Sequence, residues 1–141
     1  MKNNFVPYQQ SVELKELGFN EDCFAYYRLN TWDVYFKPAK MELFLHHCYG
    51  DDHEYGVNAP LWQQAFEWFR TNKMSDSCVC RYQEKDEGGI LFLYCIDKNY
   101  GIKRSRYVKE CFYTYKEAEL ACLKKLIKIN KSKKCTLTKQ N

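Results

Sequence analysis

The sequence predicts an α+β fold in which an antiparallel β-sheet packs against two or three helices. Two segments, 61–70 and 114–129, repeat apolar residues at helical spacing. Between them, residues 78–83, 90–96 and 102–113 read as strands separated by turn residues, which indicates a three-stranded meander. Strands that neighbour one another in sequence, set between helices, are typical of an α+β domain.

The N-terminal part is expected to add a helix and two short strands. Residues 8–17 form the predicted helix, and Gly18 supplies its stop. Residues 23–28 and 32–36 predict two short strands joined by a turn at 30–31. These short strands would accompany the meander that follows later in the chain.

The segment before the helix at 61–70 gives a weaker pattern. Residues 41–48 fit either a strand or a short helix, and their periodicity does not decide between the two. Residues 49–58 hold glycine and aspartate breakers and predict a loop. We expect Asn58 to cap the following helix, with Pro60 in its early turn, where a missing amide costs little.

The helix predicted over 114–129 carries a core face and a basic face. Thr114 is followed three residues later by Glu117, the spacing of a capping box. Helical projection gathers seven apolar residues on one arc: Ala118, Leu120, Cys122, Leu123, Leu126, Ile127 and Ile129. Four charged residues fall on the other side: Glu117, Lys124, Lys125 and Lys128. Such a broad apolar arc is expected to lie on a sheet.

Length and composition indicate one folded domain. The chain has 141 residues, enough to bury a core without disulfides, and 45% of them are apolar, which argues against disorder. We expect a single domain over residues 1–129. Residues 130–141 are basic and lack an apolar pattern, so the sequence predicts a flexible tail there.

The sequence also favours a cytoplasmic location. No stretch approaches the ~20 apolar residues needed to cross a bilayer, and the first residues lack the apolar run of a secretory signal. Most of the eight cysteines lie in apolar strings such as 93–96 and 121–123. We therefore expect a soluble cytoplasmic protein whose cysteines are reduced core residues.

Charge divides the chain into an acidic and a basic part. Residues 1–97 hold nine Lys and Arg against fifteen Asp and Glu, which gives −6. Residues 98–141 hold thirteen against three, which gives +10. A basic surface attracts phosphates or acidic partners, so this asymmetry is the strongest functional indication in the composition.

Metal binding is weakly indicated. Cys78 and Cys80 could share a strand face and be joined by His46 or His47, but the chain has no C-x₂-C pair. Adjacent histidines on a strand also point to opposite faces. The sequence therefore favours an arrangement with no metal and no cofactor.

Catalysis is not specified by any motif. A cysteine nucleophile needs a histidine within reach, but eight cysteines and three histidines guarantee a nominal match. No phosphate-binding glycine motif follows a strand. We expect a protein that binds rather than one that catalyses a reaction.

The basic part supplies a candidate surface for contact with RNA or a partner protein. On the third meander strand, alternation places Arg104 and Arg106 on one side and Lys103 with Tyr107 on the other. The complete candidate set is Lys103, Arg104, Arg106, Tyr107, Lys124, Lys125, Lys128, Lys131, Lys133 and Lys134. Such a strip could contact ~4 to 8 phosphates, with tyrosines available for base stacking. The alternative is that these lysines serve solubility alone.

The chain resembles other proteins over most of its length in outline. The resemblance is carried by three segments, residues 6–19, 59–70 and 113–127. They resemble a group of small uncharacterised proteins encoded by phages and prophages of Bacteroidota. The resemblance implies an accessory protein that acts against host defence, such as an anti-CRISPR inhibitor of an RNA-targeting (type VI) nuclease. The implied partners are the host CRISPR effector protein, its guide RNA or both, without membrane or small-molecule substrate. Residues 37–58 lie outside the resemblance.

Three hypotheses follow. The first is a non-catalytic phage protein that inhibits a host defence ribonucleoprotein through the basic strip, with exposed aromatic rings as anchors on protein. The second is a general single-stranded RNA- or DNA-binding module without a dedicated protein partner. The third is an enzyme or a zinc protein, which metal analysis would test.

Overall fold

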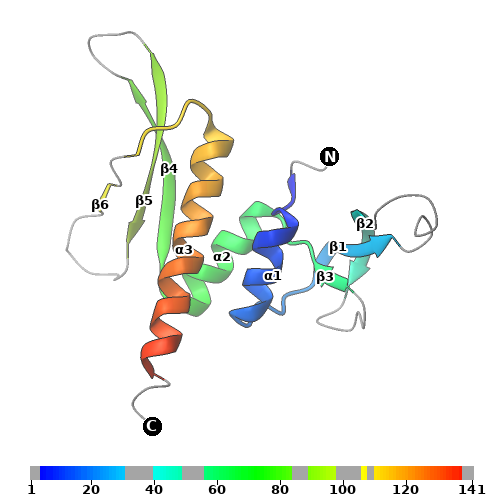
Figure 1. Ribbon diagram of the computed structural model, residues 1–141. Coiled ribbons are helices and arrows are strands. Elements are labelled where there is room, and N and C mark those ends of the chain that lie inside the picture. Colours follow the sequence, from blue (N-terminus) through cyan, green and yellow to red (C-terminus); the bar gives the residue numbers. More distant parts are fainter. Residues whose placement is uncertain are drawn as a thin grey trace. The chain divides into compact units, whose positions relative to one another are not determined.

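The computed structural model describes six ranges of the chain: 4–30, 40–48, 56–83, 89–97, 106–107 and 110–137. Within these ranges the chain forms three helices and two antiparallel sheets, which confirms the predicted α+β class (Figure 1). The chain divides into two compact units, residues 1–65 and residues 66–141. The sequence predicted a single domain over residues 1–129, which would require these two units to fold together. That single domain stays a prediction.

Helix α1 (Tyr8–Glu16) opens the first unit and ends as predicted at Gly18. Gly18 has φ +97°, a left-handed conformation that glycine adopts without a steric penalty. Its amide donates to Lys15 (2.9 Å), and the amide of Phe19 donates to Leu14 (3.0 Å). This hydrogen-bond pattern is a Schellman motif, and the burial of Phe19 and Leu14 supplies its usual hydrophobic contact.

The first unit also contains a sheet with strand order β2–β1–β3, formed by β1 (Cys23–Asn30), β2 (Lys40–Cys48) and β3 (Gly56–Asn58). The ambiguous residues 41–48 therefore belong to a strand. The loop predicted over 49–58 is wrong at its end, because β3 pairs with β1 and Val57 lies opposite Tyr27. A three-residue strand has too few positions to show a period in the sequence. The predicted strand at 32–36 lies outside the described residues.

The core of the first unit lies on the inner face of this sheet. Phe5, Ala25 and Ala59 form a buried cluster, and three partly buried residues pack against it: Tyr27, Leu43 and Leu61. The hydroxyl of Tyr27 donates to the carbonyl of Val6 (2.7 Å), so the ring is partly buried while its polar end is satisfied. The opposite face exposes Phe24 and the stacked pair Tyr26 and Phe44.

Helix α2 (Trp62–Lys73) begins later than the cap predicted at Asn58. The Asn58 side chain instead donates to the carbonyl of Glu21 (3.3 Å). A residue that precedes proline avoids the helical conformation, so the chain stays extended up to Pro60. The Gln64 side chain then accepts a hydrogen bond from the amide of Leu61 (3.0 Å), which satisfies one free donor at the start of the helix.

The second unit contains a sheet with order β4–β5–β6, formed by β4 (Asp76–Gln83), β5 (Ile90–Asp97) and β6 (Arg106–Tyr107). All neighbours are antiparallel, so the predicted meander is confirmed for its first two strands. The third strand, predicted over 102–113, is described only at β6 and at an isolated bridge. In that bridge Phe92 and Phe112 exchange backbone hydrogen bonds of 2.8 and 2.9 Å.

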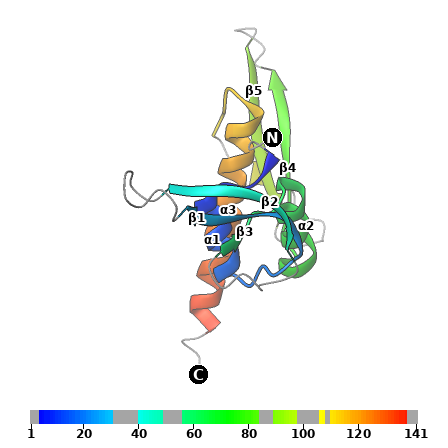
Figure 2. The same ribbon diagram turned by 90° about the vertical axis from the view of Figure 1, so that its right-hand side faces the viewer.

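Helix α3 (Tyr115–Leu137) packs along β4 and β5, as Figures 1 and 2 show. Its start confirms the capping box: the Thr114 amide donates to Glu117 (3.1 Å), and the Glu117 amide donates to the Thr114 hydroxyl (3.2 Å). The face toward the sheet buries Ala118, Cys122, Leu123, Leu126 and Ile127. Among the described helices, none combines the length and apolar content required to cross a membrane.

The predicted end of this helix at Ile129 is wrong, because α3 continues to Leu137, into the tail predicted over residues 130–141. Asn130 is buried, and its side-chain amide donates to the carbonyl of Leu126 (2.9 Å). The Ser132 hydroxyl likewise donates to Lys128 (2.9 Å). Residues 130–137 contain no glycine or proline, so nothing in them stops a helix that is already nucleated. Residues 138–141 lie outside the described chain.

Candidate functional site

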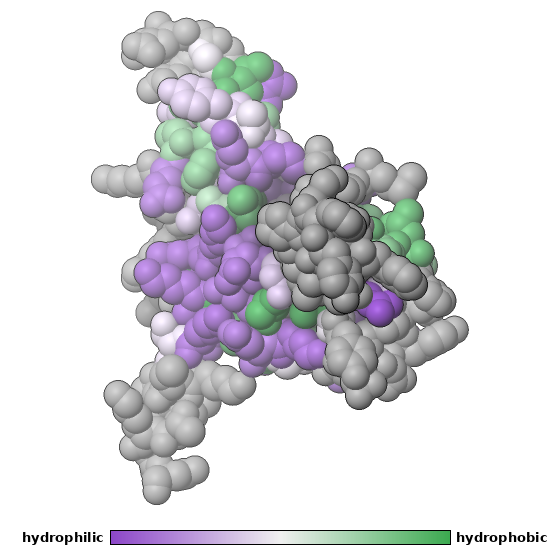
Figure 3. Space-filling view, turned by 45° about the vertical axis from the view of Figure 1, so that its right-hand side comes forward, coloured by the Kyte–Doolittle hydropathy of each residue, from purple (hydrophilic) through white to green (hydrophobic). Residues whose placement is uncertain are grey.

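Three lysines on α3 form the lysine face, defined as Lys124, Lys125 and Lys128. All three are exposed, and they lie on the side of the helix opposite to Cys122 and Leu126, which face the sheet. Lys124 and Lys128 are one turn apart, a separation of about 6 Å along the axis. Figure 3 shows predominantly hydrophilic residues over the surface that includes this helix. The helix backbone thus holds three positive charges in a fixed row.

The lysine face has no counter-charge in the part of the chain that the structure describes. Both acidic residues of α3 lie near its start and are engaged there: Glu117 in the capping box, and Glu119 in an ion pair with Lys116 (2.7 Å). No described carboxylate pairs with Lys124, Lys125 or Lys128. Carboxylates at the start of a helix and lysines toward its end also complement the helix dipole. Among the described side chains of α3, every exposed charged residue after Glu117 is therefore a lysine.

The other predicted contact residues are placed only in part. Lys131 is half-buried on α3 and has an interaction of its own, which separates it from the lysine face. Lys133 and Lys134 lie in the helical backbone of α3, and Arg106 and Tyr107 form β6 at the edge of the sheet. The side chains of these four residues lie outside the description, as do Lys103 and Arg104 entirely. Their contribution to the surface stays a prediction.

Three exposed tyrosines among the described residues of the second unit, Tyr82, Tyr113 and Tyr115, were not among the predicted contact residues. Tyr113 is 83% exposed and directly precedes the cap of α3, and Tyr82 is 46% exposed at the end of β4. The sequence named Tyr107 instead because it lies between basic residues. The sequence held no signal for the exposure of Tyr113, because a ring just before a helix cap often packs against the fourth helical residue.

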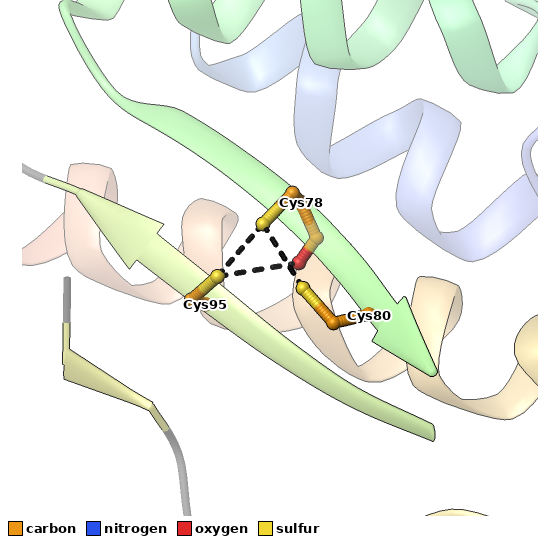
Figure 4. A group of neighbouring side chains, drawn as sticks. All are labelled: Cys78, Cys80 and Cys95. Atoms are coloured by element: carbon orange, nitrogen blue, oxygen red, sulfur yellow. Dashed lines mark hydrogen bonds between the residues drawn. The ribbon is translucent and has the colours of Figure 1, made fainter. Parts of the chain in front are cut away.

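A second candidate site is a thiol cluster, defined as Cys78, Cys80 and Cys95 (Figure 4). Cys78 and Cys80 lie two residues apart on β4 and share a face, and Cys95 lies directly opposite Cys78 on β5. The sulfur of Cys78 is 2.7 Å from that of Cys95 and 3.5 Å from that of Cys80. All three sulfur atoms lie within 4.8 Å of one another.

The thiol cluster runs from solvent into the sheet surface. Cys78 is exposed, Cys80 is partly exposed and Cys95 is buried. Burial raises the pKa of the Cys78 and Cys95 thiols, and the hydrogen bond with Cys78 raises the pKa of Cys80. All three groups are thus neutral thiols in the absence of a bound cation. Sulfur ligands of this kind suit soft metal ions.

The sequence predicted that Cys78 and Cys80 share one face of a strand, but it did not predict that Cys95 lies beside them. The signal was available in the hairpin register: when Gln83 pairs with Ile90, counting back along both strands sets Cys78 against Cys95. The sequence looked instead to His46 and His47 as further ligands. Both histidines belong to β2 in the first unit, and their side chains lie outside the description.

The chain matches no protein-family model, no curated protein and no solved structure. The resemblance to phage and prophage proteins therefore stays a prediction from the sequence. The lysine face, the exposed rings and the thiol cluster are the observations on which function has to be argued.

Proposed function

We propose that this protein is a non-catalytic binding protein that inhibits a host defence ribonucleoprotein by contacting its RNA through the lysine face. The observation that carries this proposal is the row formed by Lys124, Lys125 and Lys128, exposed and without a described counter-charge on a rigid helix. The sequence resemblance to phage and prophage proteins supplies the defence setting. The proposal is a steric and electrostatic block rather than a reaction.

Phosphate recognition fits the chemistry of the lysine face. Each lysine ammonium is a compact point charge on a flexible stem, so it can follow a phosphate backbone without demanding one exact geometry. Neutralising phosphates releases condensed counterions, and this release supplies most of the sequence-independent affinity for nucleic acid. Three lysines alone give weak binding, so a tight inhibitor needs a second contact.

The outer face of the β1–β2 sheet can supply that second contact. Phe24 is 59% exposed and Phe44 is 37% exposed, and Phe44 stacks on Tyr26 with ring centroids 5.6 Å apart. Aromatic side chains dominate the energetics of many protein interfaces because they bury a large area with few rotatable bonds. These rings support a contact with the protein component of the partner.

The test is charge reversal of the lysine face. The variant Lys124→Glu, Lys125→Glu and Lys128→Glu should lose binding to the guide-loaded nuclease by more than about tenfold, since each reversal replaces attraction by repulsion. The matched control reverses three exposed basic residues elsewhere: Lys15, Arg28 and Arg81. Both variants change the net charge by the same amount, so general charge effects cancel. Equal losses in the two variants would remove the lysine face from the proposal.

The partner itself is identified by capture from a host lysate, with mass spectrometry of bound proteins and sequencing of bound RNA. The proposal expects an RNA-guided nuclease together with its guide. Recovery of that nuclease without RNA, and with unchanged affinity after ribonuclease treatment, would contradict contact with RNA.

A second candidate function is a general single-stranded nucleic-acid-binding module. The exposed rings of Tyr82 and Tyr113 favour it, because bases of any identity can stack on tyrosine. A gel shift with unrelated RNA separates the two functions. Binding of unrelated RNA as tightly as of guide RNA, without any protein partner, supports the module and contradicts a dedicated inhibitor.

A further inference from the structure

The thiol cluster is built by the geometry of one hairpin. Side chains two residues apart on a strand point to the same face, which sets Cys78 beside Cys80. Residues directly opposite on antiparallel strands have closely spaced side chains, which sets Cys95 beside Cys78. The hairpin therefore brings three sulfur atoms together without any loop.

The face of the hairpin that carries the thiol cluster is turned away from α3. The Cys122 thiol on α3 interacts with the hydroxyl of Ser77, so Ser77 points toward the helix. Its neighbour Cys78 then points to the opposite face and is exposed. An ion from solvent can reach the cluster at Cys78 without disturbing the packing of α3.

The spacing of the sulfur atoms lies between that of a disulfide and that of a metal site, because Cys78 and Cys95 are 2.7 Å apart and a disulfide bond is about 2.0 Å long. A tetrahedral zinc ion with Zn–S bonds of about 2.3 Å holds its sulfur ligands about 3.8 Å apart. The Cys78–Cys80 separation of 3.5 Å is close to this spacing, and every sulfur pair lies within 4.8 Å. The Cys78 and Cys95 sulfur atoms, now 2.7 Å apart, would move apart by about 1 Å through side-chain rotation to hold an ion. A disulfide between Cys78 and Cys95 would leave Cys80 without a role.

We propose that Cys78, Cys80 and Cys95 bind one thiophilic metal ion, with Zn²⁺ as the probe, through three thiolates and with a fourth position open to solvent. Each thiol gives up its proton as its sulfur joins the ion, and no oxidation takes place. Three protein ligands with an open position are a known arrangement for zinc, and soft thiolates favour it over hard cations. The ion would tie β4 to β5 in the middle of the hairpin.

The experiment uses the full chain, purified without metal under a phosphine reductant. Titration with Co²⁺ should give the charge-transfer and d–d absorption of a tetrahedral thiolate site at one ion per chain, and Zn²⁺ should bleach it. The variants Cys78→Ser, Cys80→Ser and Cys95→Ser should each weaken Zn²⁺ binding by more than about tenfold. Cys78→Ser and Cys80→Ser are more informative than Cys95→Ser, because Cys78 is exposed and Cys80 partly exposed, whereas Cys95 is buried and its replacement disturbs the core.

The matched control is Cys111→Ser, which removes an exposed cysteine of the same unit that lies outside the thiol cluster. It should bind Zn²⁺ as the unchanged chain does. Folding is monitored by circular dichroism, and Zn²⁺ should raise the thermal midpoint of the unchanged chain and of Cys111→Ser only. A variant of the cluster that folds but gains no thermal stability from Zn²⁺ supports the proposal.

Three results would overturn it. The first is the absence of Co²⁺ or Zn²⁺ binding by the reduced chain at one ion per chain. The second is a loss in Cys111→Ser as large as that in Cys80→Ser, which would mean nonspecific thiol binding. The third is a mass lower by two hydrogens, mapped to a Cys78–Cys95 disulfide, in a chain that binds no Zn²⁺ after reduction; the cluster would then be a redox pair.

Discussion

Cys122 shows how a single buried thiol couples folding to pH. It is fully buried on α3, and loss of solvation raises its pKa to about 12. Placing a charged thiolate there would cost far more than placing a neutral thiol. The folded chain therefore keeps Cys122 protonated at a pH where the unfolded chain would release the proton.

The sign of this linkage predicts a loss of stability at alkaline pH. Because the folded pKa of Cys122 exceeds its ordinary value of 9.0, its contribution is fully present below pH 9.0 and is lost as the pH rises toward about 12. The expected slope reaches up to about 1.4 kcal/mol of unfolding free energy per pH unit. Urea unfolding under reducing conditions, at about pH 8 and about pH 10, measures it.

The control for this prediction is Cys122→Ala. The cavity lowers its stability at every pH, so the comparison is between slopes rather than absolute values. Burial also raises the pKa of Tyr27, Tyr94 and Tyr115, and these tyrosines add slope in both proteins. The variant should show a shallower alkaline loss; an equal slope in both proteins would contradict the assignment to Cys122.

At the scale of elements, the turn after α2 holds a residue in an unfavourable conformation. Met74 has φ +48°, in the left-handed region where a side chain clashes with the backbone. The turn is fixed on both sides, because the Ser75 amide donates to Phe69 (3.1 Å) and Arg70 pairs with Asp76 (3.0 Å). The Met74 side chain is 65% exposed and contributes little packing in return.

Met74→Gly should therefore stabilise the protein. Relief of the steric penalty outweighs the extra freedom of glycine in the unfolded chain, for a net gain of about 0.5–1 kcal/mol. Met74→Ala is the matched control, because it removes the same side chain but keeps the Cβ atom. Thermal unfolding should rank glycine above methionine and alanine. A glycine variant no more stable than the alanine variant would show that the turn relaxes to relieve the penalty.

The elements that the sequence predicted correctly are those with local signals. The stop at Gly18 and the capping box of Thr114 and Glu117 involve residues within one turn of each other, and both are confirmed. The amphipathic pattern of α3 placed Lys124 and Lys128 opposite the buried arc for the same reason. Local chemistry is sufficient wherever neighbours along the chain are also neighbours in space.

The features that the sequence missed depend on contacts between distant segments. Strand β3 is too short to show a period and exists because β1 offers it an edge. The approach of Cys95 to Cys78 requires a hairpin register that periodicity does not fix. In each case the decisive partner lies outside the sequence window.

At the scale of the molecule, the two units carry opposite charge. Residues 1–65 hold five basic and nine acidic residues, a net charge of −4, whereas residues 66–141 hold seventeen and nine, a net charge of +8. The sum is the +4 of the whole chain. A polyanion is therefore attracted by the second unit and repelled by the first, which directs it to the unit that carries the lysine face.

This division predicts how salt should affect RNA binding. The logarithm of affinity falls with the logarithm of salt concentration by about 0.7 per phosphate neutralised on a single strand. Replacing Lys124, Lys125 and Lys128 by glutamate removes three contacts, so the slope should become shallower by about 2. Fluorescence anisotropy with a labelled guide RNA across a salt series measures it. The control reversal of Lys15, Arg28 and Arg81 should weaken binding by general repulsion yet keep most of the original slope, because the proposal assigns the phosphate contacts to the lysine face and not to these residues. A slope that the α3 variant leaves unchanged would mean that the phosphates are held elsewhere on the protein.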